Sequence, residues 1–519
     1  MNAPLSDASR KAMEIVTLDD KYALDTGRAF MSGVQALVRL PLLQRKRDAL
    51  AGHNTAAFIS GYRGSPLGGY DQALWQAKKH LADNHVVFKP GVNEELGVTA
   101  VWGSQQLEFD AQSKKYDGVF GIWYGKGPGV DRSGDALKHA NLAGTAPLGG
   151  VIALAGDDHV SKSSTLAHQS DHTLIACGLP VFFPASVQDI LDLGVHAFAM
   201  SRFSGLWAGM KTVQEVVEAG ASVVTDAGRV HILLPEDFAR PEGGLHIRWP
   251  DDPLAAEARM MEIKWPAALA YIRANRLNRN VIEGRNDRFG IIASGKAYSD
   301  TRQALADLGL DDAVCRAIGV RLHKVSVVWP LEPASVREFA HGLREILVVE
   351  EKRPIIEQQL KDELYHYRAD ARPDVIGKYE PADGEGAGGE WSHRKPAENW
   401  LLRGRGTDRL PWFCPGCPHN TSTRVPDGSI AMAGIGCHGM VVWMDRSTTS
   451  WTQMGGEGVP WMGQAPFSKR AHMFANLGDG TYNHSGSLAV RQSINAGVNI
   501  TYKILYKSPT RSSTTAPSP

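Results

Sequence analysis

Cysteine is scarce and long apolar runs are missing from this 519-residue sequence, and both absences restrict what the protein can be. Its five cysteines are an odd number in a large chain, which argues against a disulfide framework. No run reaches the length of a membrane span, and the first ten residues lack the apolar core of a signal peptide. We therefore expect a cytoplasmic protein that does not bind membranes.

The chain also has no net charge at pH 7. Lys and Arg total 56, and Asp and Glu total 56, so no overall field favours nucleic acid or an anionic membrane. The composition, 43% hydrophobic and 22% charged, is that of an ordinary globular protein. The length allows roughly three domains with sizeable cores. A small-molecule substrate is the expectation for such a chain.

Short apolar runs alternate with helical patterns along the first half of the chain. The expected strands are 55–60, 118–124, 150–155, 179–183 and 230–234. Helices are expected at 187–199 and 212–219, and another at 30–51 with an interruption near Pro41. Strands that alternate with helices predict an α/β fold with a doubly wound parallel sheet, whose ligands bind at the carboxyl ends of the strands.

Changes in composition divide the chain into parts. The expected parts are a polar lead-in (1–28), a first domain (29–250), a second domain (255–370), a linker rich in Gly, Pro and charge (371–410), a third domain (411–506) and a tail (507–519). The second domain, which begins its α/β pattern at 288–295, shows no evident catalytic cluster, so we expect a scaffold there.

A glycine-rich turn in the third domain is the first candidate site. Residues 476–485 read NLGDGTYNHS, and a helical pattern follows over 488–495. Glycines let the backbone approach an anion, a helix N-terminus offers free N–H groups, and Asp479 supplies a carboxylate for a hard cation. A diphosphate with Mg²⁺ fits this arrangement, and an ordinary hairpin turn is the alternative.

Two adjacent carboxylates, Glu94 and Glu95, stand at the start of a helix of small residues in the first domain. One interpretation is a charged first turn that the helix macrodipole stabilises. The other is that Glu94, buried beneath small residues, hydrogen-bonds a heterocyclic nitrogen and shifts its protonation. A thiamine cofactor needs such a group in order to form its ylid.

Three cysteines lie close together in the third domain. Cys414 and Cys417 are three positions apart, and Cys437 comes twenty residues later among glycines. A structural zinc site is one interpretation, with His419 or His438 as the fourth ligand. An iron–sulfur cluster is another. A redox Cys-Pro-Gly-Cys pair is less favoured because it would leave the third cysteine without a role.

Together these stretches resemble the 2-oxoacid:ferredoxin oxidoreductases, most closely the large fused indolepyruvate ferredoxin oxidoreductases. The resemblance runs from about residue 18 to residue 506. It is carried by residues 61–69 (GYRGSPLGG), 93–94, 414–437, 452–459 (TQMGGEGV) and 476–487. The resemblance implies thiamine-diphosphate-binding doubly wound parallel sheets, as a pyrimidine domain and a diphosphate domain, with an intervening transketolase-C-terminal-like α/β domain.

The resemblance also implies roles for matching residues. Glu94 takes the position that contacts the aminopyrimidine, Ser65 presents a hydroxyl to the substrate carboxylate, and Asp479 is the first Mg²⁺ ligand. The implied cofactor-binding positions are Gly436, His438, Gly478, Asp479, Gly480 and Thr481. Further polar residues on strand-end loops could border the substrate, although most polar loop residues have no chemical role. They are Arg63, Asp157, Asp158, His159 and His168.

Cys414, Cys417 and Cys437 match three ligands of the family's [4Fe–4S] cluster nearest the thiamine. The family's fourth cluster cysteine lies further downstream, and no cysteine follows Cys437 here. The implied reaction is the oxidative decarboxylation of an arylpyruvate to an aryl-acetyl-CoA, with coenzyme A as co-substrate and electrons passed to ferredoxin. A homodimer is expected, with the cofactor between the first and third domains. The family also uses a catalytic gamma domain, which we expect to be missing from this chain.

The end of the sequence departs from the family pattern. After an expected strand at 499–506, residues 507–519 contain no large apolar side chain, where the family continues with a second Mg²⁺ ligand. We therefore expect the chain to be truncated and inactive, with residues 507–519 as a disordered, aberrant tail. Two alternatives to the oxidative reaction stay open. One is a non-oxidative thiamine-dependent decarboxylase or ligase, and the other is a non-catalytic truncated subunit with a structural zinc site.

Overall fold

The computed structural model describes residues 16–109, 114–162, 166–368, 370–380, 390–391, 412–461, 465 and 470–506. The chain forms two compact units. Unit 1 comprises residues 1–160 and 167–398, and unit 2 comprises residues 161–166 and 399–519. The predicted tail at 507–519 lies outside the described residues.

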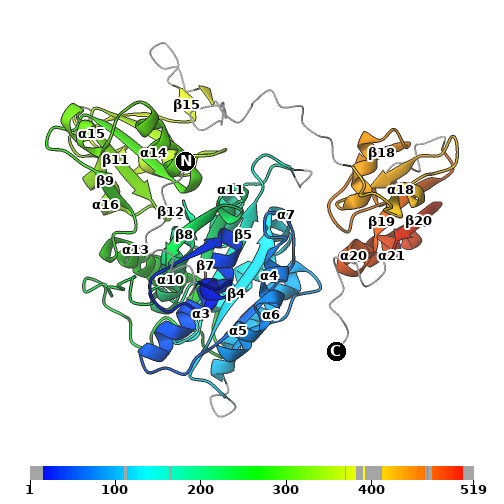
Figure 1. Ribbon diagram of the computed structural model, residues 1–519, viewed down its shortest axis with the longest axis horizontal. Helices are drawn as coiled ribbons and strands as arrows, with labels where there is room; N and C mark the ends of the chain where they lie inside the picture. The colour runs from blue at the N-terminus through cyan, green and yellow to red at the C-terminus, as the bar shows by residue number, and fades with distance from the viewer. Residues whose placement is uncertain are drawn as a thin grey trace. The chain divides into compact units, whose positions relative to one another are not determined.

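Unit 1 is built around a seven-stranded sheet with the order β12-β6-β7-β5-β4-β2-β3 (Figure 1). Its strands are β2 (Ala56–Gly61), β3 (Val86–Phe88), β4 (Val119–Lys126), β5 (Val151–Asp157), β6 (Val181–Phe182), β7 (Ala208–Val213) and β12 (Val327–Trp329). All neighbours pair in parallel except β12, which is antiparallel to β6. The α/β class and the parallel sheet predicted from the sequence are therefore confirmed.

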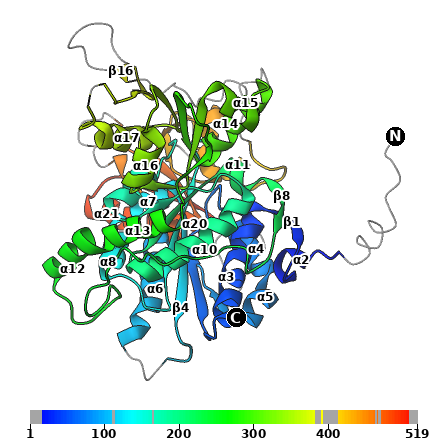
Figure 2. The same cartoon turned by 90° about the vertical axis from the view of Figure 1, so that its left-hand side faces the viewer.

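Helices cover both faces of this sheet. α3 (Gly33–Leu50), α10 (Val187–Ser204) and α13 (Trp265–Ala274) pack side by side, as Figure 2 shows. α6 (Glu94–Gln105) packs against β2 and β4 and against α8 (Gly134–Ala143). The connections from β2 to β3 and from β3 to β4 run in opposite directions along the sheet, so right-handed crossovers place their helices on opposite faces.

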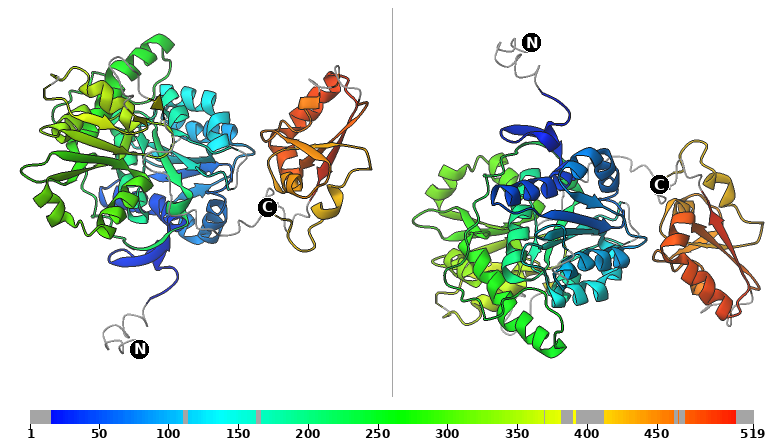
Figure 3. Two further views of the ribbon diagram at one scale, coloured as in Figure 1. Left: turned by 90° about the horizontal axis from the view of Figure 1, so that it is seen from above. Right: turned by 90° about the horizontal axis from the view of Figure 1, so that it is seen from below.

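The second domain has a five-stranded sheet with the order β14-β13-β10-β11-β9. Its strands are β9 (Arg279–Ile282), β10 (Phe289–Ser294), β11 (Val320–Val325), β13 (Glu345–Val349) and β14 (Asp374–Ile376). In Figure 3 its green strands lie beside the larger blue and cyan sheet of the same unit. β14 pairs with β13, so the chain predicted as a linker from residue 371 still contributes an edge strand. β12 comes from this domain but extends the first sheet.

Unit 2 contains a four-stranded parallel sheet with the order β18-β17-β19-β20. The strands are β17 (Ala431–Ala433), β18 (Thr448–Trp451), β19 (Met473–Gly478) and β20 (Ile500–Leu505). A helix follows β19 without a break, as α20 (Asp479–Thr481), η6 (Tyr482–Gly486) and α21 (Ser487–Asn495). The predicted strand, glycine turn and helix are therefore present.

Some predicted elements differ from the structure. Pro41 lies inside the continuous helix α3 instead of interrupting it. Residues 230–234 form no strand, although their sequence is apolar. The helix predicted at 212–219 is reduced to α11 (Gln214–Val217), because residues 212 and 213 belong to β7. No helix among the described residues is both long and apolar enough to span a bilayer.

Candidate functional site

In unit 1 the chain order of the strands reverses between β2 and β4. β3 lies on one side of β2 and β4 on the other, so the carboxyl ends of β2 and β4 border the crevice where doubly wound sheets bind ligands. The glycine-rich segment 61–69 leaves β2 at this point, and Lys126 ends β4. A Cβ on Gly64 would stand 2.4 Å from Cδ of Lys126, so the two strand ends meet at a glycine that leaves room for the lysine.

Glu94 begins α6 at the same end of the sheet. Asn93 caps the helix, since its Oδ1 accepts a hydrogen bond of 2.9 Å from the Leu96 N–H. The Trp123 indole N–H donates to the Glu94 carbonyl at 2.9 Å. The Glu94 side chain is only 5% exposed, and a Cβ on Gly129 would stand 2.7 Å from its Oε1. The structure therefore buries Glu94 beneath small residues, as the second interpretation of the sequence expected.

Lys126 lies at the candidate site, and no sequence motif indicated it. It is 7% exposed and ends the apolar strand β4. Burial lowers its pKa, and the negative charges of Asp158 and Glu94 oppose that shift. In the sequence it is a single lysine at the end of an apolar strand. Many strands end in a charged residue, so this pattern does not mark a site.

The loop after β2 also carries Ser65 and Arg63, both partly buried. Arg63 faces the carboxyl group of Asp71. Burial raises the pKa of Asp71, whereas the Tyr124 hydroxyl and Arg63 lower it. Leu67 packs so closely on β5 that a Cβ on Gly156 would lie 2.7 Å from its Cγ. The loop containing Ser65 is therefore held across the ends of β2 and β5.

The polar residues at and after the end of β5 fall into two groups. Asp157 is fully buried and accepts a hydrogen bond of 2.8 Å from the Ser170 N–H. His159 lies between Asp157 and Glu351 of the second domain. His168 instead packs against the start of the helix after β4, where a Cβ on Gly127 would stand 2.4 Å from its Cβ. Burial lowers the pKa of His168, so its neutral form is favoured.

In unit 2 the chain order reverses between β17 and β19, since β18 lies outside β17 and β20 outside β19. Doubly wound sheets bind ligands at such a reversal, which here lies between the segment 434–438 and the Gly-Asp-Gly turn at 478–480. A Cβ on Gly478 would stand 3.4 Å from Nδ1 of His438, and the Thr481 hydroxyl donates to the Ile435 carbonyl at 3.4 Å. The implied cofactor positions in these two segments thus lie together, at the N-terminus of a helix that favours anions.

Glu457 is a second buried residue near the candidate site to which the sequence assigned no role. It is fully buried, its Oε2 accepts a hydrogen bond of 2.8 Å from the Gly455 N–H, and its Oε1 lies 3.9 Å from Nε2 of His438. Burial raises the pKa of Glu457 to about 7 and lowers the pKa of His438 to about 4. The segment 452–459 therefore braces the loop that carries His438.

The cysteines occupy two places in unit 2. Cys414 and Cys417 share a turn in which the Cys417 N–H donates to the Cys414 carbonyl at 3.0 Å, while Cys437 begins the 3₁₀ helix η4 (Cys437–Trp443). Within the described part of the chain, no three His, Cys, Asp or Glu side chains are grouped so that they could hold a metal ion. The three thiols have the donor chemistry for a cluster, but the structure does not bring them together.

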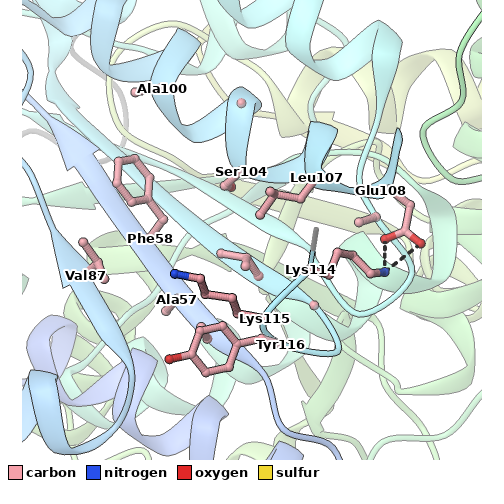
Figure 4. A pocket seen from close by; sticks show the side chains of 15 residues that line it. Ala57, Phe58, Val87, Ala100, Ser104, Leu107, Glu108, Lys114, Lys115 and Tyr116 are labelled. Carbon is pink, nitrogen blue, oxygen red and sulfur yellow. Dashed lines mark hydrogen bonds and ion pairs between the residues drawn. The ribbon is translucent and has the colours of Figure 1, made fainter. Parts of the chain in front are cut away.

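A cavity of about 450 Å³ lies at the other end of the first sheet (Figure 4). Ala57, Phe58, Val87 and Leu107 give it an apolar lining, and its charged border includes the ion pair of Glu108 with Lys114 at 2.9 Å. Residues at the amino-terminal starts of β2 and β4 border it, whereas Glu94 and Lys126 lie at the carboxyl side. This cavity is therefore separate from the candidate site.

Comparison with known proteins agrees with the resemblance. The family model for the indolepyruvate ferredoxin oxidoreductase middle domain matches residues 278–412. The chain is similar to the indolepyruvate oxidoreductase subunit IorA of Methanothermobacter marburgensis, with 25% identity over 90% of this chain and 73% of that one. It is 28% identical to the same subunit of Archaeoglobus fulgidus, over 69% of this chain and 58% of that one.

Among solved structures the chain is similar to a 2-oxoglutarate:ferredoxin oxidoreductase from Magnetococcus marinus. That chain is 15% identical, with a TM-score of 0.46, and the match covers 67% of this chain and 62% of that chain. The sequence relatives and the middle-domain match support the resemblance to the indolepyruvate ferredoxin oxidoreductases.

Proposed function

We propose that this chain is a member of the indolepyruvate ferredoxin oxidoreductase family, as its sequence relatives and the middle-domain match support, and that it serves the thiamine-dependent oxidative decarboxylation of an arylpyruvate. The product would be an aryl-acetyl-CoA, with electrons passed to ferredoxin. The burial of Glu94 at the start of α6, beside the carboxyl ends of β2 and β4, is the observation that carries the proposal. Thiamine diphosphate, when bound, supplies the electron sink for the loss of carbon dioxide.

Glu94 is suited to hold a proton at a ring nitrogen of the cofactor. Its carboxyl group is largely shielded from water by Gly129 and by the strand ends. A hydrogen bond to a carboxyl group in such surroundings is stronger than one in water. In the proposed role, Glu94 donates to or accepts from the aminopyrimidine and so sets which nitrogen carries the proton.

Lys126 is suited to bind the carboxylate of the 2-oxo acid. Its ammonium group is buried at the end of β4 and faces the charges of Glu94 and Asp158. A buried lysine attracts an anion more strongly than an exposed one, because water screens the charges less. Ser65, on the loop across the same strand ends, would add a hydroxyl donor to that carboxylate.

Unit 2 would hold the diphosphate. The Gly478 to Gly480 turn offers backbone N–H groups at a helix N-terminus, and Asp479 supplies one oxygen ligand for Mg²⁺. Thr481, Gly436 and His438 line the same crevice between β17 and β19. The small backbone of this turn and its place at a helix N-terminus would suit a phosphate group.

The electron path is proposed from chemistry and from the resemblance. Cys414, Cys417 and Cys437 are the thiolates that would bind a [4Fe–4S] cluster, which accepts single electrons. Among the described residues these three thiols are not grouped as metal ligands. A separate catalytic domain, coenzyme A and a homodimeric assembly belong to the same proposal.

Exchange of the thiazolium C2 proton tests the proposal directly. The chain is loaded with thiamine diphosphate and Mg²⁺, and deuterium exchange at C2 is followed by NMR. Glu94→Gln should slow the exchange by about 100-fold or more, as expected when a general acid–base group is lost. Glu95→Gln is the matched control, since Glu95 is the exposed next residue of the same helix and should exchange normally. Undiminished exchange in Glu94→Gln would refute the role.

A further inference from the structure

The end of β5 is held by buried polar contacts that the proposed reaction does not use. Asp157 is fully buried, and both its oxygens accept hydrogen bonds from Ser170, at 2.8 Å from the N–H and 2.5 Å from the hydroxyl. His159 Nε2 lies 3.8 Å from Oδ2 of the same carboxylate. Asp157 therefore connects the carboxyl end of β5 to the segment around Ser170 and to the loop that carries His159.

Glu351 of the second domain completes this arrangement. Its Oε2 lies 3.1 Å from Nδ1 of His159, and the two side chains are 13% and 8% exposed. The adjacent Lys352 donates from Nζ to the His159 carbonyl at 3.0 Å. Arg353 and Gln169 exchange two hydrogen bonds of 3.0 Å, between the backbone of the arginine and the glutamine amide. Three consecutive residues of the second domain thus contact the chain after β5.

The charges in this arrangement balance one another. Lys211 is 3% exposed and bonds Asp171 at 2.7 Å, and it also acts on Asp157 and Glu351. Burial alone would lower the pKa of His159, but Asp157 and Glu351 raise it to about 9, so the imidazole is protonated at neutral pH. Removal of one partner from a buried charge pair leaves the other charge uncompensated, which is costly. The loss of Glu351 should therefore loosen His159.

This end of β5 adjoins the lysine proposed to bind substrate. Lys126 and Gly156 are partners in the register of β4 and β5, and Asp157 follows Gly156 directly. Asp158 is 3% exposed, and its charge acts on Lys126. A shift of the β5 end would therefore change the distance between Asp158 and the Lys126 ammonium group.

We infer that Glu351 is a positioning residue for the 2-oxo acid site. Glu351 holds His159 in place. His159 and Asp157 together fix the end of β5, and this keeps Asp158 beside Lys126. The second domain then helps to position the substrate site, although its sequence contains no catalytic motif. The role of Lys126 in this inference rests on the proposed function. The fixing of the β5 end by Glu351 is independent of the proposed function.

Hydrogen exchange measures the fixing of the β5 end without any catalysis. In the full chain, Glu351→Gln should speed the exchange of the backbone amides of residues 156–159 and 168–171 by about tenfold or more. Glu351→Asp, which keeps the charge, should recover most of the protection. Glu338→Gln changes an exposed carboxylate of the same domain and is the matched control. Unchanged exchange in Glu351→Gln would overturn the inference.

Binding of indolepyruvate, measured by calorimetry on chain loaded with thiamine diphosphate and Mg²⁺, tests the link to Lys126. Glu351→Gln should weaken binding by about tenfold, and the effect should largely disappear in a Lys126→Met background, because coupled residues are not additive. If Lys126→Met alone leaves binding unchanged, the proposed role of Lys126 fails. If Lys126→Met weakens binding but Glu351→Gln does not, the positioning role of Glu351 fails.

Discussion

Gly97 of α6 lies directly against Gly61 at the end of β2. A Cβ on Gly97 would stand 2.9 Å from the Gly61 Cα and 3.4 Å from Cδ1 of Trp123. This close approach brings the first turn of the helix, and with it Glu94, down to the carboxyl ends of the strands. The small residues of α6 are therefore a packing requirement of the candidate site.

Gly97→Ala should destabilise unit 1 and displace α6 from the sheet. Because the added methyl group would meet backbone atoms of Gly61, overpacking should cost about 1–3 kcal/mol in the free energy of unfolding, measured with urea. Gly103→Ala is the control in the same helix, since nothing lies within 4 Å of a Cβ there. That change should be neutral or stabilise by about 0.5–1 kcal/mol. Equal effects at the two positions would contradict the close packing of α6.

Asp48 should be needed for the stability of unit 1. It is 4% exposed and binds Arg202 through two hydrogen bonds of 2.6 and 2.8 Å, and it also accepts from Thr55 and Gln44. Asp48→Ala leaves a partly buried guanidinium without its partner, so we expect a loss of about 3–5 kcal/mol in urea unfolding. The control is Asp25→Ala, which breaks an exposed ion pair with Lys46 and should cost about 0–1 kcal/mol. A loss below about 1 kcal/mol at Asp48 would show that the pair is not structural.

Metal content should separate the interpretations of the cysteines. Protein purified without oxygen should contain iron and show a broad visible absorbance, and Cys414→Ser or Cys417→Ser should remove both. Cys315→Ser is the control, because that buried thiol belongs to the core of the second domain. Stoichiometric zinc in place of iron would instead support a structural site.

The contacts of His159 should depend on pH. Its pKa is raised from an ordinary 6.5 to about 9, so its stabilising contribution is full below about 6.5 and is lost as the pH rises through about 9. Glu351 has a lowered pKa, so its contribution is present above 4.5 and is lost at lower pH. Asp157, Lys211, Lys296 and Lys352 are further charged groups that act on this pair. Asp157 has its pKa lowered to about 2.

We therefore expect the protection factors of amides 156–159, corrected for intrinsic exchange, to be high between about pH 5 and 8 and to fall towards pH 10. In Glu351→Gln the fall should begin at lower pH, because one of the two carboxylates that raise the His159 pKa is gone. A flat profile from pH 7 to 10 in the unmodified chain would show that the protonated imidazole does not hold the β5 end.

The sequence by itself was sufficient to predict the α/β class, the glycine turn with Asp479 and the position of Glu94 at a helix start. Each of these depends on residues close in the chain, such as the alternation of apolar runs with helical patterns, or glycines flanking a carboxylate. The strand predicted at 230–234 was wrong for a related reason, because apolar side chains suit a strand only where a neighbouring strand is available to pair with them.

Only the tertiary structure decided the rest. It placed β12 of the second domain at the edge of the first sheet, and it made β14 an edge strand where composition had indicated a linker. It also brought Lys126 beside Asp158, and Glu351 against His159 across nearly two hundred residues of chain. Such contacts depend on strand order and on the docking of one domain against another, and those are set by the packing of the whole core rather than by any local pattern of residues.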